Sequence, residues 1–304
     1  MNDDGIHIGG IIGFLKSVRY TINRIKPTRC IITFDGKGGS KKRRKIFPEY
    51  KGNRRVKQRF NRNVDWGTAP QDEEQSMKLQ LGRLIRYLEE LPVTIMSIDY
   101  CEADDVIAYL TTSLLPKSRI VIMSTDKDFY QLITDRVTVW SPTKKIEYTP
   151  EKIKEEFGVS SENFITLRTL EGDKSDNIPG IKGAGLKTIK KYIPQLTENS
   201  SFTVKDVIKF SDDPKHKYKI LQQIRENQMI IKRNYLLMQL HDVDLSNHNK
   251  RYIQQALTRK IPRLVKFRFS TMFVQDKLNG AIPNMDSWLI EFVRLDRFGG
   301  LNGN

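Results

Sequence analysis

Cysteines and long apolar stretches are scarce in this sequence. Its 304 residues include two cysteines, Cys30 and Cys101, which argues against a disulfide framework or a cysteine-based metal site. No run approaches the ~18 consecutive apolar residues of a membrane span, and the N-terminal MNDDGIHIGG lacks the basic flank and apolar run of a secretory signal. These absences predict a soluble, cytoplasmic protein with no membrane partner.

Acidic residues are in the minority, since 52 Lys and Arg against 36 Asp and Glu leave a net charge of +16. This excess predicts a polyanionic partner. It is concentrated in residues 37–62, which hold twelve basic side chains and one acid. Such a run can be merely a solvated basic arm, but it also contains Phe47, Tyr50 and Phe60, and aromatic faces among cations suit unpaired bases. An anionic membrane would require an apolar helix face, which this segment lacks, so nucleic acid is the favoured partner.

The apolar periodicity predicts an α/β fold followed by a helical region. Helices and strands are expected to alternate over 8–26, 29–36, 77–91, 93–98, 102–115, 119–128 and 137–141. This alternation is typical of a doubly wound domain with a mostly parallel sheet. Short amphipathic helices follow at about 150–157, 161–170, 184–193 and 214–232. We therefore expect an α/β domain over residues 1–149 and a helical region over residues 150–304.

Eight carboxylates stand at predicted strand ends or helix starts, where open α/β sheets collect their functional groups. They are Asp35, Glu102, Asp104, Asp105, Asp126, Asp128, Asp173 and Asp176. If they converge, they need cations to stay ionised, and ligation by oxygen alone favours Mg²⁺ or Mn²⁺. Two such ions would form the clamp used in phosphodiester hydrolysis. Each cluster alone suits a turn or a helix N-terminus equally well, so the prediction depends on their combination.

A glycine-rich turn precedes the helix expected at 184–193. Gly180, Gly183 and Gly185 leave backbone N–H groups free to bind a phosphate, and Lys182 and Lys187 add positive charge. The same pattern is typical of an ordinary helix-turn-helix corner, so by itself it indicates DNA binding only weakly.

Several motifs together resemble the 5′ nuclease family, which includes phage flap endonucleases, T-even phage RNase H and the 5′-3′ exonuclease domain of bacterial DNA polymerase I. The motifs are TFDG, PEYKGNR, CEADDVIAYL, STDKDFYQL and EGDKSDNIPGIKGAGLKTI, in the family's order, within about residues 5–195. The resemblance implies a PIN-like core, a basic helical arch over about 37–75 and a helix-hairpin-helix over about 161–193.

The resemblance also implies roles for individual residues. Lys51 and Arg54 match the family's catalytic cations, Tyr50 its stacking residue for the terminal base, and Arg43 and Arg44 its arch contacts to DNA. The implied first-metal ligands or their close neighbours are Asp35, Glu102, Asp104 and Asp105, and the second-metal group is Asp126, Asp128, Asp173 and Asp176. Two Mg²⁺ or Mn²⁺ ions are implied, with K⁺ as a further ion at the hairpin.

The implied activity is that of a divalent-metal-dependent, structure-specific 5′-3′ exonuclease or flap endonuclease, with RNase H activity on RNA primers. Its substrates would be DNA with 5′ flaps, junctions or nicks, and RNA–DNA hybrids, in phage-like DNA replication. The protein would act as a monomer in the cytoplasm of the host cell, with a sliding clamp or a single-strand binding protein as partners.

One departure from the family stands at the N-terminus. Family members begin with a strand ending in a metal-binding Asp, whereas this sequence enters the GIIGFLK helix almost directly after Met1. The sequence is cut short, the strand comes from another chain, or the gap is real and weakens activity. The last case would make the protein a DNA-junction binding protein. A PIN-like ribonuclease or toxin is a further alternative, but it would not need the hairpin or so long an arch.

Overall fold

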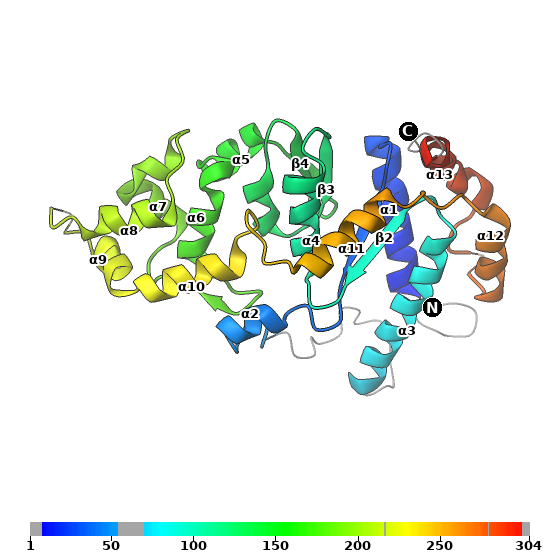
Figure 1. The fold of residues 1–304 in the computed structure, drawn as a ribbon, viewed down its shortest axis with the longest axis horizontal. Helices are drawn as coiled ribbons and strands as arrows, with labels where there is room; N and C mark the ends of the chain where they lie inside the picture. Colours follow the sequence, from blue (N-terminus) through cyan, green and yellow to red (C-terminus); the bar gives the residue numbers. More distant parts are fainter. Residues whose placement is uncertain (1–7, 54–69, 216, 279, 300–304) are drawn as a thin grey trace. The chain divides into compact units, whose positions relative to one another are not determined.

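The computed structural model describes residues 8–53, 70–215, 217–278 and 280–299 (Figure 1). The helices are α1 (Gly9–Ile25), α2 (Lys41–Ile46), α3 (Pro70–Glu89), α4 (Ala103–Tyr109), α5 (Pro150–Phe157), α6 (Ser161–Glu171), α7 (Leu186–Tyr192), α8 (Val204–Asp212), α9 (Lys219–Glu226), α10 (Gln228–Met238), α11 (Asn247–Thr258), α12 (Lys266–Gln275) and α13 (Met285–Gly299). The strands are β1 (Ile31–Asp35), β2 (Thr94–Ile98), β3 (Ile120–Met123), β4 (Val137–Ser141), β5 (Ile146–Tyr148), β6 (Gly172–Asp173) and β7 (Ile178–Pro179). Three short helical turns complete the set, namely η1 (Leu110–Leu114), η2 (Lys127–Leu132) and η3 (Pro194–Thr197).

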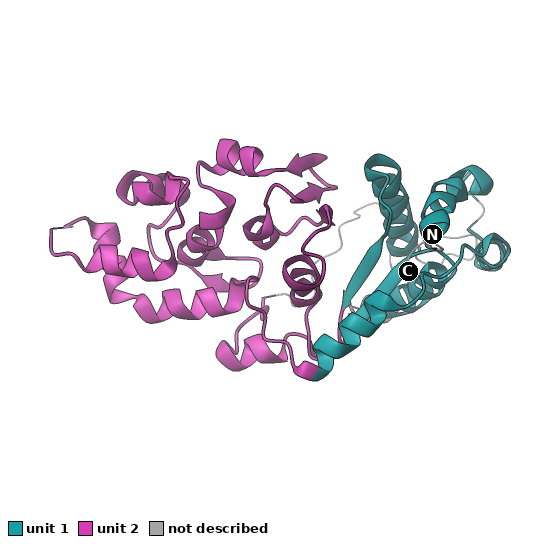
Figure 2. Cartoon of the chain, turned by 45° about the horizontal axis from the view of Figure 1, so that its top comes forward, with its two compact units in different colours: residues 1–34, 56–97, 248–304 teal, residues 35–55, 98–247 magenta. Residues whose placement is uncertain are grey.

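The chain divides into two compact units that are interleaved in sequence (Figure 2). The first unit comprises Met1–Phe34, Val56–Ser97 and His248–Asn304, and the second comprises Asp35–Arg55 and Ile98–Asn247. The boundary expected between residues 149 and 150 falls inside the second unit, and that division stays a prediction.

The first unit is built around an apolar helical core. Helix α1 places Ile11, Leu15 and Ile22 on one buried face, as the period of 3.6 residues requires, and it packs on α3 and α13. Aromatic side chains from three helices stack or meet edge to edge in the interior, namely Tyr87, Phe269, Phe273, Trp288 and Phe292. Burial of this apolar surface is the main stabilising contribution in the unit.

The second unit carries the short strands β3 to β7, helix α2 and the helices α4 to α10. Strand β3 pairs with β4 in parallel, and β4 pairs with β5 antiparallel. Helix α6 packs against η2 and α10, so its middle is buried on all sides. Strands β6 and β7 form a small antiparallel hairpin directly after α6.

The predicted class is confirmed, because the chain combines helices, parallel strands and a C-terminal helical region. Two details are wrong. In the described part of the chain the strands form three small sheets, not one doubly wound sheet, because alternation identifies strands without specifying which strands pair. The helix expected at 214–232 is in fact α9 and α10, which are separated at Asn227. No described helix is both long and apolar enough to cross a bilayer.

Candidate functional site

The N-terminus of α4 gathers the first group of predicted carboxylates. Glu102 is the N-cap residue and forms a capping box with Asp105, so each side chain accepts from a backbone N–H of the other residue. Asp35, at the end of β1, accepts from the Ala103 N–H at 2.8 Å. Three of the predicted side chains therefore lie around the first turn of one helix.

Buried cations neutralise this first group. Arg43 of α2 donates two hydrogen bonds to Asp105, at 3.0 and 2.8 Å, and one to Glu102 at 2.6 Å. Lys51 forms an ion pair with the other Glu102 oxygen, and the Tyr50 hydroxyl donates to Glu102 at 3.1 Å. Glu102 is only 2% exposed, and these partners offset the cost of burying its carboxylate.

The second group of carboxylates is less well compensated. It consists of the four expected second-metal residues, Asp126, Asp128, Asp173 and Asp176, together with Asp104, which the resemblance places with the first metal. Burial raises the pKa of Asp104 to about 7, and the charge of Asp126 adds to this shift. Burial also raises the pKa of Asp126, with Asp176 and Asp173 contributing in the same direction. These couplings place side chains from α4, η2 and the β6–β7 hairpin in one electrostatic neighbourhood.

Arg168 is the cation within this second group. Its Nε lies 3.1 Å from Asp128 Oδ1, and its Nη2 donates to Asp173. Burial nevertheless raises the pKa of Asp128 to about 7, against the lowering effect of Arg168. For Asp173, burial is opposed by hydrogen bonds from Ser175 and by Arg168, and the net pKa lies below its ordinary value.

Arg168 was missed by the sequence analysis. It stands in FITLRTLE, where every residue from 163 to 170 is buried, and no family motif marks it. The available signal was a single basic side chain in a largely uncharged helix, because an arginine is rarely buried unless it is paired.

The second group has the chemistry that suits a hard cation. Its donors are carboxylate oxygens, and the raised pKa values of Asp104 and Asp128 mean that nearby cations do not offset their burial and repulsion. Among the residues that the structure describes, no three His, Cys, Asp or Glu side chains are close enough to one point to hold a metal ion. The predicted acids therefore share a neighbourhood without forming a finished coordination sphere, and the assignments of individual ligands stay predictions.

The turn after α2 joins the two groups. The Lys51 N–H donates to the Asp176 carbonyl at 2.8 Å, and the Asn177 side chain donates to the Glu49 carbonyl at 2.9 Å. The Asn53 side chain donates to the Lys174 carbonyl at 2.7 Å. The PEYKGN segment is thus fastened to the β6–β7 hairpin, with Lys51 next to the acids.

The glycine-rich turn between β7 and α7 presents the predicted phosphate-binding groups to solvent. Lys182, Gly183, Gly185 and Lys187 are exposed, and Gly183 has a φ of 85°, which favours glycine. Glycine is required at position 180 for a different reason, because the Cβ of any other residue would lie 2.0 Å from the Glu171 carbonyl oxygen. Gly180 therefore has a structural role, while DNA contacts by this turn stay predictions.

Two other predicted residues have informative positions. Tyr50 is 3% exposed and packs with Ile165 and Ile178, so its ring is not free to stack on a base in this conformation. Arg44 is exposed on α2 while Arg43 points to the acids. Arg54 and arch residues 54–69 lie outside the described residues, and all these roles stay predictions.

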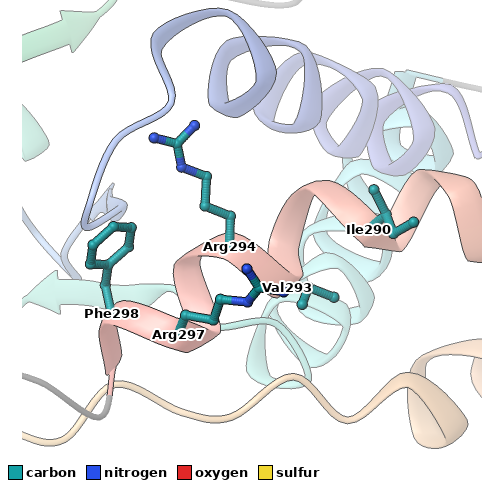
Figure 3. Close-up of a pocket in the computed structure, with 5 residues that line it drawn as sticks. All are labelled: Ile290, Val293, Arg294, Arg297 and Phe298. Carbon is teal, nitrogen blue, oxygen red and sulfur yellow. The ribbon is translucent and has the colours of Figure 1, made fainter.

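A pocket in the first unit is unrelated to these predictions. Figure 3 shows that it is lined by one face of α13, with Ile290, Val293, Arg294, Arg297 and Phe298. None of the predicted site residues contributes to it, and it offers no carboxylate.

Comparisons with known proteins agree with the motifs. Residues 1–158 match the family model for the N-terminal resolvase-like domain of 5′-3′ exonucleases. The chain is 38% identical over 192 residues to the 5′-3′ exonuclease of Buchnera aphidicola subsp. Schizaphis graminum, with 60% of each chain aligned. It therefore spans less than two thirds of that relative.

Solved structures of a bacteriophage T5 protein are also similar. One, crystallised with metal ions, is 25% identical with a TM-score of 0.62, covering 88% of this chain and 92% of the T5 chain. Another, named as a flap endonuclease complex with DNA and metal ions, is 23% identical with a TM-score of 0.63, covering 88% and 91%. The second likeness concerns the fold alone.

Proposed function

Because the chain belongs to the family of the 5′-3′ exonuclease N-terminal resolvase-like domain, we propose that it is a divalent-metal-dependent 5′ nuclease acting on DNA with 5′ flaps, junctions or nicks. The main support is the convergence of acids from α4, η2 and the β6–β7 hairpin beside Lys51. An excess of buried carboxylate charge next to a cation is the chemistry expected of a metal-assisted phosphodiesterase.

The acids would hold the metal, and we propose two ions, Mg²⁺ or Mn²⁺. The second group, Asp104, Asp126, Asp128, Asp173 and Asp176, would supply most of the oxygen donors, with Asp35, Glu102 and Asp105 as further ligands or close neighbours. When bound, the ions would act as Lewis acids toward water and the scissile phosphate. The acids must release their protons to bind a cation, and burial makes that release costly in its absence.

Lys51 and Arg43 would have separate tasks. Lys51 pairs with Glu102 from a turn beside the acids. Its ammonium would donate to a scissile phosphate and stabilise the charge that develops on it. Arg43 is held by Glu102 and Asp105 together. It would hold these two carboxylates in place while Lys51 contacts the substrate.

Contacts with DNA would come from surfaces that carry no acids of the site. The exposed Arg44 of α2 and the exposed Lys182 and Lys187 near α7 supply cations for phosphates. K⁺ at this hairpin, RNA–DNA hybrids as substrates, and a sliding clamp or single-strand binding protein as partners belong to the same proposal.

A second candidate is a junction-binding protein that cleaves slowly or not at all. It is favoured by one observation, since Glu102 and Asp105 are already engaged by Arg43 and Lys51. Carboxylates that are neutralised by the chain's own cations are poorer metal ligands.

A labelled 5′-flap DNA tests both candidates. We expect cleavage near the flap junction in Mg²⁺ and no cleavage in EDTA, with DNA still bound in EDTA. Binding without cleavage at any Mg²⁺ or Mn²⁺ concentration would support the second candidate. Failure to bind flap DNA at low salt would contradict both.

A further inference from the structure

Tyr100 is an exposed aromatic residue in an unusual backbone conformation. It is 53% exposed and has a φ of 62°, a left-handed value that only a few per cent of non-glycine residues adopt. It lies in the loop between β2 and α4, two positions before the Glu102 cap of the site. A tyrosine in this conformation must be held there by its surroundings.

The loop after β1 provides that support. The Tyr100 N–H donates to the Lys37 carbonyl at 3.0 Å, and the Gly36 N–H donates to the Cys101 carbonyl at 3.0 Å. Glycine is required at position 36, because the Cβ of any other residue would lie 1.7 Å from the Ile98 carbonyl oxygen. Two loops are thus fixed against each other, and the Tyr100 ring projects from a rigid base.

One lysine lies over the ring, and a second lysine stands in the adjoining loop. The Lys41 Nζ lies 5.2 Å from the ring centroid, and both Lys37 and Lys41 are exposed. Asp99 is the nearby acid, and its Oδ1 accepts from the Lys37 N–H at 3.3 Å. An exposed aromatic ring with lysine residues nearby is the combination that binds an unpaired base together with its phosphates.

The contrast with Tyr50 strengthens this interpretation. Tyr50 also adjoins the acids, but it is 3% exposed and its hydroxyl donates to Glu102. Of these two tyrosines near the α4 N-terminus, Tyr100 is the one whose ring can be reached.

We propose that Tyr100 is a positioning residue that stacks on an unpaired base of the substrate strand, while Lys37 and Lys41 neutralise the adjacent phosphates. This inference rests on the proposed function, because it assumes that single-stranded nucleic acid approaches the α4 N-terminus. Stacking there would hold the strand in register with the acids that begin two residues later.

The test uses a 5′ flap with 2-aminopurine at successive flap positions, because stacking quenches its fluorescence. The key variant is Tyr100→Asn, since asparagine tolerates a positive φ and lacks the ring. We expect quenching by the wild type and by Tyr100→Trp at one position, and none by Tyr100→Asn. In cleavage, the asparagine variant should raise KM roughly 5- to 150-fold, the range of one lost stacking contact, and leave kcat unchanged.

Tyr218→Asn is the matched control, because Tyr218 is 55% exposed and lies at a helix N-cap, where asparagine is favoured. The Tyr218→Asn variant should quench 2-aminopurine as the wild type does, and Tyr100→Asn should melt at the wild-type temperature. Equal quenching and equal KM in Tyr100→Asn, or no quenching by the wild type, would overturn the proposal. Quenching is measured in EDTA and does not depend on cleavage. If the wild type binds the flap but never cleaves it, the proposed nuclease activity is contradicted, while the quenching data still test the role of Tyr100.

Discussion

The two units differ in the polar and charged side chains that they bury. In the first unit, α1, α3, α12 and α13 enclose aliphatic and aromatic side chains, such as Trp288 and Phe292. The second unit also buries apolar side chains, such as Trp140 and Phe164, but its interior around α4 and α6 includes the charged Glu102, Arg168 and Asp176. Apolar burial stabilises a fold directly, whereas buried ion pairs roughly offset their own desolvation. The difference indicates that apolar burial stabilises both units, and that the buried charges of the second unit serve a chemical purpose.

The largest expected effect separates function from stability in the second unit. Asp126→Asn combined with Asp128→Asn should reduce flap cleavage by a factor on the order of 10³ or more, because the proposed metal site loses two anionic ligands. The same variant should unfold in EDTA at an equal or higher denaturant concentration. Asparagine at 126 can still accept the Asp128 backbone N–H bond, while burial and like-charge repulsion are relieved.

Flap binding in EDTA is the control for that double variant and should be unchanged. Wild-type cleavage by the variant would contradict the assignment of the second group as the metal site. Loss of stability without loss of cleavage would mean that these two acids stabilise the second unit and do not take part in catalysis.

The opposite pattern is expected in the first unit. Phe292→Ala removes a ring that is fully buried against Trp288, and should lower the free energy of unfolding by about 3–5 kcal/mol. Cleavage per folded molecule should stay at the wild-type level at 20 °C. Urea denaturation and an active-site titration measure the two quantities, and a matching loss of kcat would show that the first unit supports the chemistry directly.

The Lys51→Ala variant distinguishes a role of Lys51 in catalysis from a role in substrate binding. If Lys51 stabilises charge that develops on the phosphate, kcat should fall by about 10²–10³ while flap affinity changes little. Lys42→Ala is a suitable comparison, because Lys42 forms an exposed ion pair with Asp244, and such pairs contribute little. A loss of affinity with kcat preserved would make Lys51 a DNA contact only.

The sequence predicts the positions of the acids along the chain well, but it does not predict which side chains contact them. Asp35, Glu102 and Asp126 follow predicted strands, and their positions at strand ends or helix starts are confirmed. Local pattern suffices there, because the carboxyl end of a strand is set by its own residues. Burial of Tyr50 depends on Ile165 and Ile178, more than a hundred residues away. The role of Arg168 depends likewise on Asp128, so neither could be deduced from nearby sequence.

The smallest expected effect concerns pH and uses the metal-free protein. The pKa of the Asp128 carboxyl is raised from an ordinary value of 3.8 to about 7, so between these values the folded state binds a proton that the unfolded state has lost. Stability therefore falls as pH rises from about 4 to about 7, by about 1–3 kcal/mol for this group after allowance for relaxation. Denaturation in EDTA at several pH values should show less decline in Asp128→Asn than in the wild type. Adding Mg²⁺ should flatten the wild-type curve, since a bound cation favours the ionised carboxylate. An identical decline in both proteins would mean that Asp128 is ionised without a metal. The second unit would then stabilise its buried carboxylate with its own cations and hydrogen bonds, whereas the first unit has an apolar interior.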